Sequence, residues 1–113
     1  MGQSSSTLTP EMAAQIKTRV DEIIANNKVV VFSKTYCPYC TKAKNLLAQH
    51  KAEAHIVELD SEDEGSAIQA YLLELTGQRT VPNIFINQKH IGGCDDLFKL
   101  EKSGQLKTLV AKI

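Results

Sequence analysis

A stripe of apolar residues at helical spacing predicts the first helix of the chain. Thr9-Pro10-Glu11 is typical of a helix start, with a hydroxyl at the N-cap, a proline at the first helical position and an early acidic residue. The stripe consists of Met12, Ile16, Val20, Ile23 and Ile24. Asn26-Asn27 is expected to end this helix, and the Ser-rich residues 2–8 in front of it predict a flexible tail.

Shorter apolar runs predict the strands. Val29–Phe32 is a continuous β-branched and aromatic run, which is typical of a strand covered on both faces. Ile56–Leu59 and Asn83–Ile86 are two further strand candidates. The turn residues 87–89, followed by His90-Ile91, predict that the last of these runs continues into a hairpin.

Apolar residues at helical spacing also occur between the predicted strands and after them. One helix is expected to begin directly after Cys37, and its inner face comprises Ala43, Leu46 and Leu47. Residues 61–64 fit a capping box, Ser to Glu at three residues, which predicts a second helix that ends at Thr76-Gly77. The inner face of that helix comprises Ile68, Leu72 and Leu75. A closing helical region is expected around Leu97, Leu100, Leu106, Leu109 and Val110.

The order α-β-α-β-α-β-β-α predicts an α/β fold. A strand–helix–strand start requires a parallel pair, and the closing hairpin adds antiparallel strands. We therefore expect a four-stranded mixed sheet flanked by helices on both faces. With 113 residues, no internal repeat and no linker, the sequence predicts one domain over residues 9–113 behind a tail over residues 1–8.

Charge and cysteine content narrow the function classes. Thirteen basic and thirteen acidic residues balance, so overall charge gives no reason to expect a nucleic acid or a membrane surface as partner. Three cysteines are too few, and odd in number, for a secreted disulfide framework. The first ten residues lack the features of a secretory signal and carry no Arg, so we expect a cytoplasmic protein.

The N-terminal residues allow two interpretations. Gly2 and Ser6 occupy the positions of a myristoylation pattern. The simpler interpretation, which we favour, is a short polar tail, because such patterns often match by accident. No cluster of Lys or Arg supplies a second membrane signal, so stable membrane association is not expected in either case.

The Cys37-Pro38-Tyr39-Cys40 segment carries the chemistry. If Pro38 is the first helical residue, Cys37 is the N-cap, and its sulfur can accept hydrogen bonds from the amides of Tyr39 and Cys40. The positive end of the helix dipole and the nearby Lys34 favour the thiolate, which is the nucleophilic form. Cys40 lies one turn along and deeper, so it is expected to stay protonated and to resolve a mixed disulfide on Cys37.

A zinc site is the alternative for a CxxC pair. Zinc needs four ligands, which usually come as two such pairs. The remaining candidates are Cys94, His50, His55 and His90, and none is paired with another at ligand spacing. We therefore favour redox chemistry and expect no metal.

Three motifs together resemble a known family. Lys34–Cys40 (KTYCPYC), Thr80-Val81-Pro82 and Gly92–Asp96 (GGCDD), in this order, are similar to the dithiol glutaredoxins, and the resemblance extends from about Thr9 to Ile113. A thioredoxin would carry Gly-Pro between the cysteines and a nearby Trp, and this chain has neither. The resemblance implies a thioredoxin-like fold and a glutathione-dependent thiol-disulfide oxidoreductase. Its substrates would be protein–glutathione mixed disulfides and protein or low-molecular-weight disulfides.

The resemblance also implies a role for each site residue. Cys37 and Cys40 would be catalytic and would form the redox disulfide. The implied glutathione contacts are Lys34, Tyr39, Gln69, Arg79, Thr80, Val81, Pro82, Gly93, Cys94, Asp95 and Asp96. Glutathione itself would be the co-substrate.

These contacts divide among the three parts of glutathione. A cis bond before Pro82 would expose the Val81 backbone to the cysteinyl part, and beside the CPYC motif we favour this over a proline that merely leads a strand. Amides at Cys94 or Asp95 would meet the γ-glutamyl end, whereas Asp95 could instead be a plain helix N-cap. Lys34, Gln69 and Arg79 would meet the glycyl carboxylate. The Cys94 thiol is expected to have no catalytic role, and Tyr36 and Tyr39 either line the groove or simply pack.

Three other functions remain open. The first is a [2Fe–2S] cluster held between two subunits, which the stiff Pro38 is expected to disfavour. The second is a general protein-disulfide reductase fed by thioredoxin reductase, and the third is a scaffold without enzymatic activity. We favour a monomer with glutathione, glutathionylated or disulfide-bonded proteins and, through oxidised glutathione, glutathione reductase as its partners.

Overall fold

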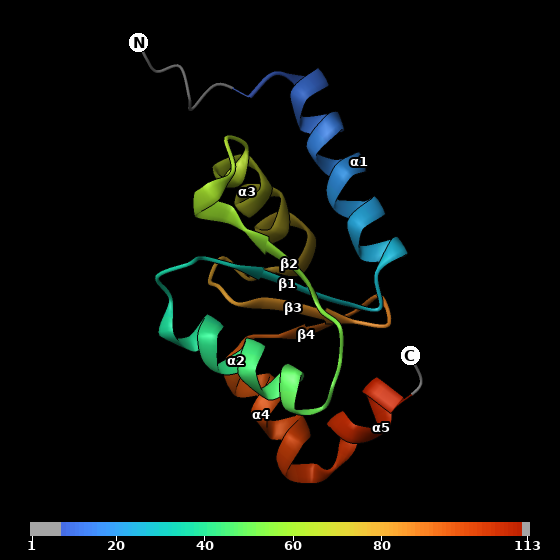
Figure 1. The fold of residues 1–113 in the computed structure, drawn as a ribbon. Coiled ribbons are helices and arrows are strands. Elements are labelled where there is room, and N and C mark those ends of the chain that lie inside the picture. Colours follow the sequence, from blue (N-terminus) through green and yellow to red (C-terminus); the bar gives the residue numbers. More distant parts are fainter. Residues whose placement is uncertain (1–7, 112–113) are drawn as a thin grey trace.

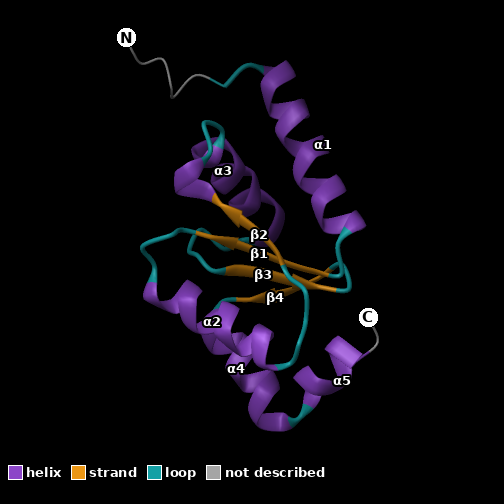
Figure 2. Cartoon of the chain, viewed as in Figure 1, coloured by secondary structure: helices purple, strands orange, loops and turns teal. Residues whose placement is uncertain are grey.

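Four strands form one mixed sheet with the order β2-β1-β3-β4. The computed structural model describes residues 8–111, and Figures 1 and 2 show its architecture. β1 (Val29–Ser33) pairs in parallel with β2 (His55–Glu58) and antiparallel with β3 (Asn83–Ile86), which continues into β4 (Lys89–Gly92). Every residue of β1 and β3 is buried, which confirms that the central strand is covered on both faces.

Helices cover both faces of this sheet, as the sequence predicts. α1 (Pro10–Asn26) and α3 (Gly65–Thr76) lie on one face, whereas α2 (Pro38–Gln49), α4 (Cys94–Ser103) and α5 (Gln105–Ala111) lie on the other (Figure 1). Side chains of a strand alternate between faces, so β1 supplies both cores. Val30 and Phe32 pack under α1 and α3, while Val29 and Val31 pack under α2 and α4. The predicted fold class is confirmed.

The capping box predicted at Ser61 is wrong. Leu59–Ser61 form a short 3-10 helix, η2, in which Leu59 is buried, and α3 begins only at Gly65. The acidic residues Glu62 and Glu64, rather than capping the helix, form ion pairs with Arg19 of α1 at 2.7 and 2.9 Å. Burial of Leu59 and the attraction of a cation thus outweigh a local capping preference worth about 1 kcal/mol.

Two residues assigned to the inner helix faces are exposed. Met12 lies in the first turn of α1, which extends away from the sheet in Figure 1, and 48% of its surface is accessible. Leu75 is 46% exposed and lines a surface hollow beside Ile24 and Phe85. The closing region is two helices rather than one, because Gly104 adopts a left-handed conformation (φ 80°) between α4 and α5.

The predicted tail falls largely outside the described residues. Of residues 1–8 only Leu8 is described, so the expected flexibility of the tail and the myristoylation pattern at Gly2 lie outside the structure. Within residues 8–111, the helices fall short of the combined length and hydrophobicity that a membrane span requires.

Candidate active site

Cys37 caps the N-terminus of α2, as predicted. After β1 the chain turns through Lys34, whose carbonyl accepts a 3.1 Å hydrogen bond from the Cys37 amide. Pro38 is the first helical residue, and the Cys37 sulfur accepts a 3.3 Å hydrogen bond from the amide of Cys40. The amide and the helix dipole both favour negative charge on this half-buried sulfur. The geometry suits a nucleophilic sulfur within reach of solvent.

Cys40 has the opposite environment. Its side chain is fully buried at the base of the first turn of α2. Burial, followed by the hydrogen bond with Cys37, raises the pKa of the Cys40 thiol to about 11. At neutral pH the pair therefore consists of one accessible sulfur and one protonated sulfur held behind it, which suits a resolving role for Cys40.

The loop that precedes β3 lies against the Cys37 sulfur. The Val81–Pro82 peptide bond is cis, as the resemblance implied, and the Cys37 thiol lies 3.8 Å from the Val81 carbonyl oxygen. Gln78, on the same loop, donates hydrogen bonds from its side-chain amide to the carbonyls of Thr80 (3.0 Å) and Pro82 (2.9 Å). Gln78 thereby fixes the loop in place.

A groove of about 460 Å³ lies beside this loop. It is lined by Tyr39, Gln78, Thr80, Val81, Pro82, Gly93, Cys94, Asp95 and Asp96. Eight of these nine residues were singled out from the sequence, and they come from α2, the cis-proline loop and the start of α4. Gln78 was missed, because a polar residue after a helix-ending glycine has no pattern that separates it from an ordinary loop residue.

The start of α4 differs from the interpretation in which Asp95 is the N-cap of the helix. Gly93, and not Asp95, is the N-cap, and Asp96 accepts a 2.9 Å hydrogen bond from the Gly93 amide. The Asp96 carboxylate is thus engaged in holding the helix start. Asp95 lies in the first turn of α4, next to amides that have no partner within the helix, so this end of the groove offers donors and one carboxylate.

The remaining predicted contacts lie outside the lining of this groove. Gln69 of α3 donates a 2.8 Å hydrogen bond to the carbonyl of Arg79, which ties α3 to the cis-proline loop. Lys34 lies in the turn before Cys37, close enough to Asp60 to lower the pKa of that carboxyl. Contact between these three residues and a carboxylate stays a prediction.

Asp60 of η2 anchors the turn that leads to Cys37. Its carboxylate accepts a 3.0 Å hydrogen bond from the Thr35 amide and a second from the Thr35 hydroxyl. These two bonds, the hydroxyl bond first, lower the pKa of Asp60. The anchor is therefore complete above the ordinary Asp pKa of about 4 and is lost as the pH falls through the lower value of the folded state.

We expect Asp60→Ala to slow the alkylation of Cys37 by iodoacetamide at pH 7 by roughly three- to tenfold, because the turn would no longer hold the sulfur at the helix start. Asp60→Asn, which keeps an acceptor oxygen, should retain most of the rate. The control is Asp63→Ala, an exposed acid in the same loop. An alkylation rate for Asp60→Ala equal to that of the unaltered chain would contradict this positioning role.

The fold and the site define a class of protein. A parallel strand–helix–strand unit carries a CxxC pair at the start of its helix, and a cis-proline loop faces the first cysteine. This combination defines a thiol-disulfide redox protein with a thioredoxin-like fold. Within residues 8–111 no group of three or more potential metal ligands gathers at one place.

Comparison with known proteins identifies the family. The glutaredoxin family model matches residues 29–91. A glutaredoxin of Ricinus communis is 56% identical over 95 residues, which cover 84% of this chain and 93% of that protein. Glutaredoxin-1 of Rhizophagus irregularis is 51% identical over 100 residues and covers 88% and 99% of the two chains. The chain belongs to the glutaredoxin family.

Solved structures agree with this assignment. The crystal structure of the buckwheat glutaredoxin–glutathione complex superposes with a TM-score of 0.89 at 45% identity, over 92% of this chain and 94% of that one. The wheat glutaredoxin superposes with a TM-score of 0.82 at 51% identity, over 93% and 94% of the two chains. Both similarities span almost the whole described domain, so the predicted thioredoxin-like glutaredoxin fold is confirmed.

Proposed function

We propose that this chain uses glutathione to reduce protein–glutathione mixed disulfides. The observation that carries the proposal is the Cys37 sulfur, which lies at the N-terminus of α2 and 3.8 Å from the Val81 carbonyl, beside the groove. The Cys37 thiolate attacks the glutathione sulfur of the substrate, the substrate disulfide breaks, and the protein leaves as a thiolate that takes up a proton. A second glutathione thiolate then attacks the Cys37–glutathione disulfide, which releases oxidised glutathione and restores Cys37.

The groove supports glutathione as the co-substrate. Its middle offers the backbone of Val81 to a peptide, and its far end offers the first amides of α4 to a carboxylate and the Asp95 carboxylate to an ammonium group. A tripeptide with a free amino group and two carboxylates has matching chemistry. The similarity to the buckwheat glutaredoxin–glutathione complex supports the same ligand.

The second cysteine extends the reaction to protein disulfides. Cys37 attacks one sulfur of the substrate disulfide, and the other substrate sulfur leaves as a thiolate that takes up a proton. Cys40 then loses its proton and attacks the Cys37 sulfur of this mixed disulfide, which forms the Cys37–Cys40 disulfide and releases the second substrate sulfur as a thiolate. Two glutathione molecules reduce that disulfide and become oxidised glutathione, which glutathione reductase returns to the thiol form. Because this cycle consumes reduced glutathione, we propose that the protein works in the reducing cytoplasm. Both cysteines and the whole lining of the groove come from one chain, so we propose that a monomer is sufficient.

The test is turnover of the mixed disulfide of glutathione and mercaptoethanol, with glutathione, NADPH and glutathione reductase. We expect the rate to depend on the glutathione concentration and to vanish without it. A parallel reaction supplies insulin, NADPH and thioredoxin reductase without glutathione. Turnover in the second reaction but not in the first would replace this proposal with a general disulfide reductase.

A further inference from the structure

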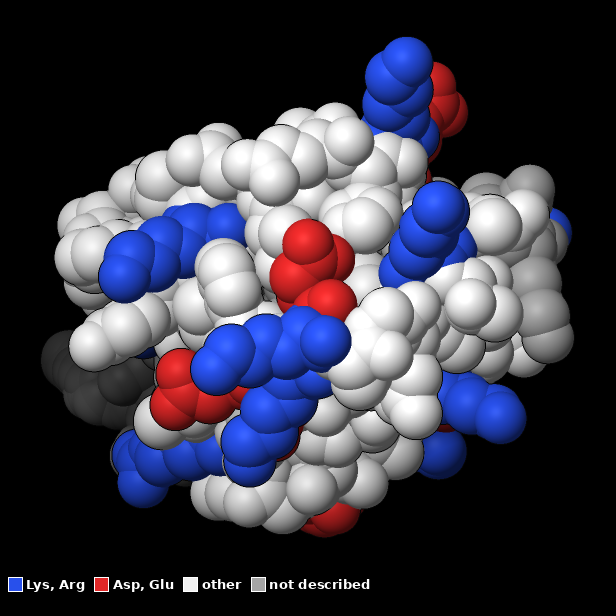
Figure 3. Space-filling model, turned by 90° about the horizontal axis from the view of Figure 1, so that it is seen from below, with Lys and Arg blue, Asp and Glu red and all other residues white. Residues whose placement is uncertain are grey.

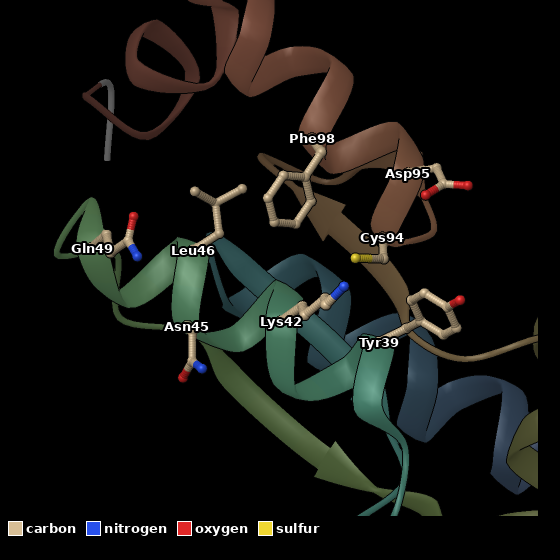
Figure 4. A pocket seen from close by; sticks show the side chains of 8 residues that line it. All are labelled: Tyr39, Lys42, Asn45, Leu46, Gln49, Cys94, Asp95 and Phe98. Carbon is tan, nitrogen blue, oxygen red and sulfur yellow. The ribbon is translucent and has the colours of Figure 1, made fainter.

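A second hollow of about 400 Å³ lies next to the glutathione groove, between α2 and α4. Figure 4 shows Leu46 and Phe98 facing one another across it, with Lys42, Asn45 and Gln49 following one another along α2. We call it the α2–α4 groove. Tyr39, Cys94 and Asp95 line both this hollow and the glutathione groove. The two therefore form one continuous surface that passes the active site.

Two of the three exposed aromatic side chains in residues 8–111 line this surface, and the third, Tyr36, directly precedes Cys37 in the sequence. The chain has six aromatic residues, and three of them are exposed: Tyr36 (71%), Tyr39 (58%) and Phe98 (38%). Tyr36 and Tyr39 flank Cys37 in the sequence, and Phe98 lies on the facing side of the α2–α4 groove. Aromatic residues are enriched where proteins bind other proteins, and here they occur where a substrate must approach Cys37.

The lining of the α2–α4 groove contains one cation, Lys42, and one carboxylate, Asp95, which also lines the glutathione groove. Lys42 lies 5.7 Å from the centre of the Tyr39 ring, and none of the ion pairs in residues 8–111 involves it. Figure 3, which views the molecule from the side of α2, α4 and α5, shows more basic than acidic side chains on this face. An acidic group on a bound partner would meet a cation here.

We propose that the α2–α4 groove binds the polypeptide chain that flanks the cysteine of a disulfide substrate. The inference rests on the proposed function and adds a preference of the enzyme for certain residues near the cysteine of its substrate. The favoured flank carries a large apolar side chain, which packs on the exposed face of Phe98 above the almost fully buried Leu46, and an acidic residue, which meets Lys42.

The length of the α2–α4 groove sets the number of residues between the substrate cysteine and the apolar side chain. The substrate cysteine is bonded to the sulfur of glutathione, whose groove is lined by Tyr39. Tyr39 and Leu46 are seven helical positions apart, or about 10 Å. An extended chain covers that distance in about three residues. The apolar side chain should therefore lie about three residues from the substrate cysteine. During this step glutathione occupies the other groove, and the two ligands adjoin at the residues that line both, Tyr39, Cys94 and Asp95.

The test compares glutathionylated peptides with the small mixed disulfide of glutathione and mercaptoethanol. One peptide carries Leu three residues from its cysteine and Glu next to the Leu; matched peptides replace the Leu by Ala or the Glu by Gln. For the unaltered chain we expect the Leu-Glu peptide to have a kcat/KM at least about fivefold above that of the Ala peptide, mainly through a lower KM. The small substrate gives the reference rate.

Phe98→Ala should remove the preference for the Leu-Glu peptide, Phe98→Leu should restore part of it, and Lys42→Gln should remove only the preference for Glu over Gln. None of the three should change turnover of the small substrate. Met12→Ala, which removes an exposed apolar side chain on α1 (48% exposed, against 38% for Phe98), is the control and should change nothing.

Two results would overturn the inference. The first is an equal kcat/KM for the Leu and Ala peptides with the unaltered chain. The second is a Phe98→Ala variant whose kcat/KM falls as much for the small substrate as for the Leu-Glu peptide. Failure of the proposed function would look different, because the unaltered chain would then turn over neither kind of mixed disulfide.

Discussion

Cys37→Ser should lower the turnover of a glutathione mixed disulfide by at least about a thousandfold. The helix start stabilises a negative sulfur, but a serine hydroxyl stays protonated at neutral pH and cannot attack a disulfide at a useful rate. Cys37 is also the one sulfur of the pair that is accessible, since Cys40 is fully buried. The measurement is the glutathione-coupled rate with the mercaptoethanol mixed disulfide.

Cys40→Ser is the matched variant, and it should behave differently. Deglutathionylation needs only Cys37, so the rate with the small mixed disulfide should stay within about threefold of the original value. Reduction of a protein disulfide should fall much further, because nothing then resolves the intermediate. A Cys37→Ser variant that retains activity while Cys40→Ser loses it would exchange the two roles.

Alkylation gives an independent measure of the same difference. With the Cys40 pKa near 11, iodoacetamide at pH 7 should modify Cys37 first and leave Cys40 largely unmodified. Mass analysis of the peptide that contains both cysteines distinguishes the two products. Preferential modification of Cys40 would contradict the burial argument.

Local sequence patterns predicted the core elements of the fold because each pattern has one dominant physical cause. The continuous run Val29–Phe32 has no polar face, so it must be covered on both sides, and it is. Proline directly after Cys37 indicates a helix start and hence an N-cap sulfur, which the structure has. The roles of the motifs around Pro82 and Gly93 followed only from the resemblance to the glutaredoxins, and the structure brings both motifs to one groove.

The errors arise where a long-range contact outweighs a local preference. The Ser61 capping box competes with burial of Leu59 and with the ion pairs of Arg19, a residue more than forty positions away. The spacing of Met12 fits the helical stripe, but no sheet lies under the first turn of α1. Gln78 acts through bonds to backbone carbonyls that come within reach only after the cis-proline loop has formed.

The positioning of the active site depends on how tightly η2 packs against α3. Asp60 of η2 holds the turn before Cys37, while Leu59, one residue earlier, is part of the core under α1 and α3. After η2 the chain turns back, and the first residue of α3 packs directly against the backbone of Leu59. Only a residue without a side chain fits at that point, and it is Gly65.

Gly65→Ala is therefore expected to lower the free energy of unfolding by about 3 kcal/mol or more, the upper range for overpacking. An added Cβ would lie 1.8 Å from the Leu59 carbonyl oxygen and 2.8 Å from its carbon, and both atoms are backbone that cannot rotate away. Gly77→Ala is the matched control: its Cβ would meet nothing within 4 Å, so only the left-handed conformation (φ 78°) opposes it, at a cost of about 1–2 kcal/mol. Urea unfolding of both variants measures the difference, and a Gly65→Ala protein as stable as Gly77→Ala would show that η2 and α3 are not in close contact.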